Sequence, residues 1–101
     1  MKNQKIKENH QRITEKLLNK ETKSALDILR EMIKSTQINE FILQHERHSE
    51  TYRYILKYTI EGVEDPEREK IHQRLQKSIL ELADRVKQTI LMNNSEIGRA
   101  S

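Results

Sequence analysis

The segment from Gly62 to Pro66 constrains the fold of this chain more than any other feature. It holds the only proline and the only glycine before Gly98, and it separates two long amphipathic patterns. Gly62 can end a helix by adopting a positive φ, Asp65 can cap the next helix, and Pro66 suits a first helical turn, where no backbone donor is lost. The sequence therefore predicts a turn at which one long helix folds back on another.

Two shorter amphipathic patterns precede the long ones. The first extends from about Asn3 to Asn19, and its apolar face is narrow. This face consists of Ile6, His10, Ile13 and Leu17. The second begins near Ser24, which can cap a helix while Asp27 reciprocates, and its broad apolar arc predicts neighbours on two sides. The arc consists of Ala25, Leu26, Ile28, Leu29, Met32 and Ile33.

The two long patterns cover about residues 39–61 and 66–93. The stripe of the first consists of Ile38, Phe41, His45, His48, Tyr52, Ile55 and Thr59, widened by Ile42, Leu56 and Ile60. The stripe of the second consists of Ile71, Leu75, Ile79, Leu82, Val86 and Ile90, joined by Leu80, Ala83 and Leu91. Residues 35–39 contain polar, turn-tolerant residues but neither Gly nor Pro, so both a helix break and a continuous helix stay open there.

Two long helices joined by so short a connection are expected to lie antiparallel. The two N-terminal helices would pack near the ends of this hairpin that lie far from the turn. The predicted fold class is all-α, a small bundle of three to four helices built on the hairpin of residues 39–61 and 66–93. Residues 1–94 are expected to form a single helical domain. Asn93 and Asn94 would end the last helix and leave residues 95–101 as a polar tail or linker.

Composition argues against several classes of function. The chain has no cysteine, so it can form neither a disulfide nor a thiolate metal site. It has no glycine-rich phosphate loop and no glycine-flanked serine nucleophile, so we expect neither catalysis nor a cofactor. Neither a signal peptide nor a membrane-spanning run is present in the sequence, which predicts a cytoplasmic protein without membrane contact.

The net charge of +3 is concentrated in the first predicted helix. Its basic residues outnumber Glu8 and Glu15, and they could attract nucleic acid. They are Lys2, Lys5, Lys7, Arg12, Lys16 and Lys20. They spread around the helix, however, without a recognition motif or an aromatic platform. Nucleic-acid binding is therefore the alternative hypothesis, and salt-sensitive binding to random duplex DNA is the observation that would favour it.

His45 and His48 lie three residues apart on one predicted helical face, a spacing that metal ligands use. His10 and His72 could approach them in a bundle. Because the sequence places no third ligand, no metal is predicted, and a polar layer between helices is the favoured interpretation over a metal site. Such a layer would help to fix the register of the hairpin at some cost in stability. An uncovered middle of this helix would give the same pattern.

Tyr54 and Tyr58 lie four residues apart, on a face different from that of Tyr52. Tyrosine gives contact area at low entropy cost and arginine adds bidentate hydrogen bonding, so a surface patch that binds a peptide or nucleic acid is one interpretation. The candidate residues are Tyr54, Tyr58, Arg47, Arg53 and Lys57. In the alternative, favoured interpretation, the two rings pack against the N-terminal helices and leave their hydroxyl groups at the edge.

The stretch SETYRYILKY from Ser49 to Tyr58, continued by EGVEDPER from Glu61 to Arg68 and by the residues up to Asp84, carries a family resemblance. It resembles the N-terminal helical region of long bacterial tetratricopeptide-repeat proteins, although the repeat consensus itself is absent. The resemblance implies a helical segment that precedes a protein-binding repeat array, and it implies no catalytic residue.

The expected function is a non-catalytic helical domain for protein–protein interaction or scaffolding. The family resemblance would make it the N-terminal segment of a larger helical-repeat protein. The expected partner is another protein or a second copy of the chain, bound by apolar surface that the domain's own core does not use.

Overall fold

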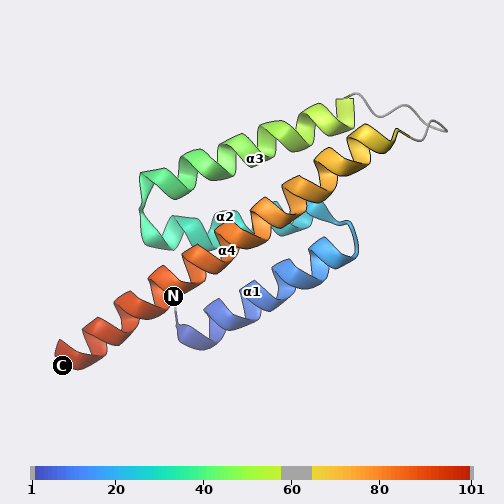
Figure 1. Cartoon of the computed structure of the whole chain (residues 1–101). Coiled ribbons are helices and arrows are strands. Elements are labelled where there is room, and N and C mark those ends of the chain that lie inside the picture. Colours follow the sequence, from blue (N-terminus) through green and yellow to red (C-terminus); the bar gives the residue numbers. More distant parts are fainter. Residues whose placement is uncertain (1, 58–64, 101) are drawn as a thin grey trace.

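The computed structural model of the chain describes residues 2–57 and 65–100, and for residues 95–100 it describes the backbone alone. Within these ranges the chain forms four α-helices and no strand (Figure 1). They are α1 (Asn3–Leu18), α2 (Thr22–Thr36), α3 (Asn39–Lys57) and α4 (Pro66–Ala100). The prediction of an all-α helical bundle is confirmed.

Successive helices run antiparallel, and α4 is the longest. The pair of α2 and α4 occupies the middle of the bundle, while α1 and α3 flank it on opposite sides (Figure 1). In the described part of the chain α1 and α3 do not touch each other. The domain is therefore elongated and flat, with Cα extents of 58 × 24 × 16 Å. Its long axis follows α4, whose 35 residues span ~52 Å at the helical rise.

One hydrophobic core joins all four helices. Its fully buried members include Ile13 of α1, Leu29 of α2 and Leu82 of α4. The apolar faces predicted for the first, second and fourth helices are the faces that the structure buries. Burial of this apolar area is the main favourable term in folding, because each buried aliphatic side chain contributes about 1.5–3 kcal/mol.

The turn from α1 to α2 differs from the prediction. We expected Ser24 to cap the second helix, with Asp27 reciprocating, but α2 begins at Thr22 after Glu21. Lys20 adopts a positive φ of 59°, and the Glu21 amide donates to the Lys16 carbonyl at 2.8 Å. This tight reversal leaves Ser24 inside the first turn of α2, so the predicted cap is wrong.

The second and third helices are separate, which decides the question left open by residues 35–39. Gln37 adopts the left-handed conformation with φ 57°, at a cost of about 1–2 kcal/mol for a residue with a Cβ atom. The Thr36 hydroxyl oxygen accepts a hydrogen bond from the Ile38 amide at 3.1 Å and donates to the Ile33 carbonyl at 2.7 Å. Polar side chains thus end α2 without Gly or Pro.

The start of α4 confirms the role predicted for Asp65. The Glu67 amide donates to Asp65 Oδ1 at 3.0 Å, and Arg68 Nε donates to Asp65 Oδ2 at 3.1 Å. Both hydrogen bonds lower the pKa of Asp65, and the one from the Arg68 side chain has the larger effect. Pro66 is the first helical residue, as predicted. The predicted helix stop at Gly62 lies outside the described residues.

The position of the N-terminal helices was predicted wrongly. Instead of packing at the far ends of the hairpin, α1 runs along α4 over most of its length. Near the start of α4, Lys20 Nζ lies 3.4 Å from Glu69 Oε1. At the other end, Asn94 Nδ2 donates to Asn3 Oδ1 at 2.7 Å. The long apolar stripe of α4 needs neighbours along its whole length, and α1 and α2 provide them.

The predicted end of the last helix at Asn93 and Asn94 is also wrong, because α4 continues to Ala100. The low helix propensity of Asn and of Gly98, up to about 1 kcal/mol each, does not stop a helix that is already formed. Whether residues 95–101 act as a linker stays a prediction.

Candidate interaction surface

The helix α3 is the least covered helix of the bundle. Within its described span of 19 residues only Phe41 and Ile55 are buried, whereas the 15 residues of α2 include six buried ones. Most of the exposed large hydrophobic side chains among the described residues also lie on α3. These are Ile42, Leu43, Tyr54 and Leu56, against Leu18 and Met92 elsewhere. The surface of α3 is therefore the first place to look for a binding site.

A second helical stripe, opposite the buried one, runs along the outside of α3. Its members recur in alternating steps of three and four residues, so they lie on one face of the helix. They are Glu40, Leu43, Arg47, Glu50, Tyr54 and Lys57, which we call the outer strip. All six are exposed, and the two apolar members, Leu43 and Tyr54, have 55% and 53% of their surface accessible.

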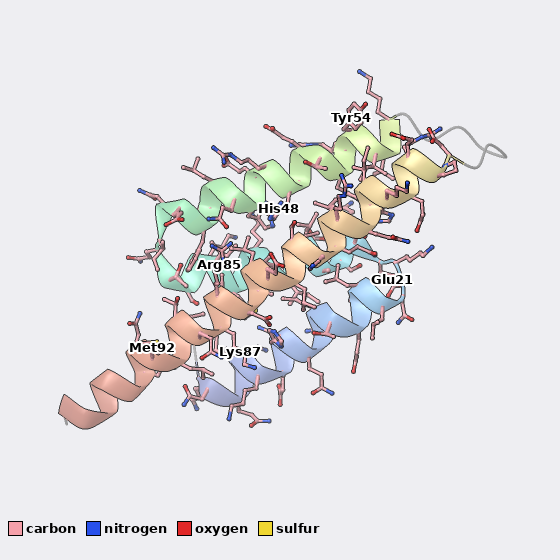
Figure 2. All side chains as sticks on the ribbon, in the orientation of Figure 1. Glu21, His48, Tyr54, Arg85, Lys87 and Met92 are labelled. Carbon is pink, nitrogen blue, oxygen red and sulfur yellow. The ribbon has the colours of Figure 1, made fainter. Side chains whose placement is uncertain are left out.

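The structure distributes the predicted partner-binding residues over two faces. Arg47, Tyr54 and Lys57 share the outer strip, and Figure 2 shows Tyr54 on the outer side of α3. Arg53 is one residue before Tyr54 and therefore lies about 100° around the helix from it, outside the outer strip. Tyr58 lies outside the described residues. Packing against the first two helices, the alternative for the tyrosines, is wrong for Tyr54, since its strip faces away from α2 and α1 does not touch α3.

The buried stripe of α3 is narrower than predicted. Ile42 and Leu56 were expected to widen it, but they are 38% and 54% exposed. The physical reason is the flat arrangement of the bundle, in which α3 has only α2 and α4 as neighbours. With α1 on the far side, no third helix of the described chain packs on α3.

The two histidines of α3 form a polar layer between helices. His45 Nε2 donates to the carbonyl of Leu26 in α2 at 2.8 Å. His48 lies between α3 and α4 with Arg85 beside it, and Arg85 Nη2 donates to Gln44 Oε1 at 2.6 Å (Figure 2). Burial, and then the positive charges of His45 and Arg85, lower the pKa of His48. The structure thus places these histidines in a polar layer between helices, which is the interpretation that the sequence favoured.

The other histidines do not join this pair. His10 contacts Asp84 of α4, and His72 Nε2 lies 2.8 Å from the Thr22 hydroxyl. The His72 ring also packs on Tyr52, with a centroid distance of 6.1 Å. Among the described residues no group of three His, Cys, Asp or Glu side chains lies close enough to hold a metal ion. Nothing in these contacts supports His45 and His48 as metal ligands.

The basic residues of α1 are more clustered than the sequence interpretation allowed. Lys5, Arg12 and Lys16 fall within about 40° of one another around the helix axis. Two cations at the end of α1 form ion pairs with carboxylates. Lys16 Nζ lies 3.3 Å from Glu21 Oε2, and Lys20 Nζ lies 3.4 Å from Glu69 Oε1. These ion pairs reduce the positive potential of this flank.

Comparison with protein-family models, with curated proteins and with solved structures finds no match to this chain. The resemblance to tetratricopeptide-repeat proteins therefore stays a prediction. None of the helices, as far as the structure describes them, is both long and apolar enough to cross a membrane.

Sequence reasoning missed Glu40, Leu43 and Glu50 as members of the surface, because it followed the buried period of α3. The signal in the sequence was the residue types, because Leu43 and Tyr54 are large apolar residues on the side of the helix opposite the buried stripe.

Proposed function

We propose that this chain is a non-catalytic helical domain for protein–protein interaction or scaffolding, and that the outer strip of α3 is its contact surface. The observation that carries this proposal is the pair of exposed apolar side chains, Leu43 and Tyr54, on one strip together with Arg47. Tyrosine and arginine are enriched among the residues that dominate binding energy, and they are most effective when water is excluded around them.

The architecture supports a scaffolding role for α3. Its inner side is fixed by the core residues Phe41 and Ile55 and by the hydrogen bond from His45 to α2. The outer strip is thus presented on a rigid element, and little conformational entropy is lost when a partner binds. The family resemblance would place this surface at the N-terminal end of a longer protein-binding array.

The experiment compares the full-length protein with a double variant, Leu43→Glu with Tyr54→Glu, as bait for proteins from its own cell extract. We expect the variant to lose partners that the wild-type protein retains, since charged groups replace the apolar contacts. Leu18→Glu is the matched control, because Leu18 is 79% exposed on α1. An identical set of captured proteins for all three baits, with a second copy of the chain itself counted among them, would contradict the proposal.

Nucleic-acid binding through α1 is the second candidate, and it is favoured by the clustering of Lys5, Arg12 and Lys16 on one flank. The proposed role would be nonspecific attraction to phosphate groups, because three cations supply only a modest, salt-sensitive affinity. The carboxylates of Glu21 and Glu69 next to this flank argue against it, so we rank it below protein binding.

A further inference from the structure

The outer strip of α3 is complementary to a second copy of the same strip that runs in the opposite direction. The strip has its midpoint between His48 and Ser49, and residues at equal distances from this midpoint form three pairs. They are Glu40 with Lys57, Leu43 with Tyr54, and Arg47 with Glu50. Two pairs join opposite charges and the third joins two apolar side chains, so an antiparallel pairing sets no like charges against each other.

The spacing of the strip fits helix–helix packing. Steps of three and four residues give a mean period of 3.5, which keeps a seam of side chains facing a partner helix along its whole length. A two-fold axis through the midpoint would generate an isologous contact, in which each pair of residues occurs twice. The leucine of one copy would then pack on the tyrosine ring of the other at both ends of the seam.

We propose that the outer strip of α3 binds the outer strip of a second copy of this chain, with the two helices antiparallel. This inference rests on the proposed function, since it names the partner of the same surface. A parallel arrangement in register would set Glu40, Arg47 and Glu50 each against the same residue, and like charges in direct opposition are destabilising. The charge pattern therefore selects both the partner and its direction.

The bundle leaves this strip open for a second copy. All six of its residues are exposed, and α1 lies on the far side of the α2–α4 pair. Within the strip, Glu40 Oε1 accepts a hydrogen bond from Gln44 Nε2 at 3.1 Å. The contact is small, because α3 spans only ~28 Å, so we expect weak pairing that becomes visible at high protein concentration.

The test is a charge exchange in the full chain, followed by sedimentation equilibrium at protein concentrations up to about 1 mM. Arg47→Glu alone, or Glu50→Arg alone, sets like charges against each other in both symmetry-related layers. We expect each single variant to weaken dimerisation at least about tenfold. The double variant Arg47→Glu with Glu50→Arg restores opposite charges in both layers, and we expect it to restore the dimer.

The matched control uses Glu31 and Lys34 of α2, an exposed pair with the same three-residue spacing and an Nζ–Oε1 distance of 3.3 Å. Glu31→Lys, Lys34→Glu and their double variant are expected to dimerise as the wild type does. Circular dichroism of every variant separates lost pairing from lost folding.

Three results would overturn the self-pairing: a wild-type monomer at all concentrations, single variants of Arg47 and Glu50 that dimerise normally, or a double variant that stays monomeric. A different measurement, the capture of proteins from cell extract, tests the proposed function. If the chain is monomeric but Leu43→Glu with Tyr54→Glu loses a captured protein, the surface binds another protein and only the self-pairing is wrong. If the captured proteins are unchanged as well, both proposals are wrong.

Discussion

At the scale of single residues, polar groups inside the bundle decide its sensitivity to pH. His48 lies in the interface between α3 and α4, and burial together with the charges of His45 and Arg85 lowers its pKa below the usual 6.5. The folded state therefore binds a proton less readily than the unfolded state. The contribution of neutral His48 to stability is fully present above the unfolded pKa and is lost as pH falls below it.

We expect His48→Gln to reduce the pH dependence of stability. The wild-type protein should lose melting temperature between about pH 7.5 and pH 5.5, and the variant, which has no proton to bind at this position, should lose less. Thermal unfolding followed by circular dichroism at several pH values measures the difference. An equal loss of melting temperature in both proteins would show that protonation of His48 does not contribute to the pH dependence of stability.

At the scale of helices, the caps and turns expected from the sequence had different outcomes. The segment from Asp65 to Pro66 begins α4 as its residue types require, because a carboxylate can accept the amide hydrogen that a first turn leaves unpaired. Ser24 is the opposite case, because its capping pattern is plausible but is not used. The chain reverses at Lys20, where α1 packs against α2 and α4, and α2 therefore begins before Ser24.

Asp65 gives a prediction at this scale. Asp65→Ala should lower the melting temperature, since the amide of Glu67 loses its acceptor, while Asp65→Asn should keep most of the cap and lower it less. The lowered pKa of Asp65 means that its carboxylate stabilises the fold above the unfolded pKa of 3.8, and that this contribution is lost as pH falls through the folded value. Equal melting temperatures of the Ala variant and the wild type would contradict the capping role.

At the scale of the whole molecule, the shared core makes the four helices one unit. The core residues of α1, α2 and α4 belong to a single cluster, and α4 contacts all three other helices. Helices that share one core are expected to unfold together in a small domain. The flat arrangement has the further result that α3 is covered on one side only, which creates the outer strip.

Leu82→Ala tests this cooperativity. The side chain of Leu82 is fully buried, and its removal leaves a cavity that should lower the free energy of unfolding by about 2–5 kcal/mol. Urea unfolding measured by circular dichroism, with hydrogen exchange of amides in each helix, should show all four helices destabilised by a similar amount. Protection that decreases in α4 alone would indicate independent unfolding of the helices.

The sequence by itself determined that the chain is helical and which faces of α1, α2 and α4 are buried, because the period of apolar residues depends on neighbours within a few positions along the chain. The same holds for the helix cap at Asp65. Only the tertiary structure decided that α1 runs along most of α4 and that Ile42 and Leu56 are exposed. These two features depend on which helices become neighbours and on how much of one helix the next one covers, and no local sequence pattern encodes either. The structure also extends the last helix beyond Asn94, against the local signal of the two asparagines.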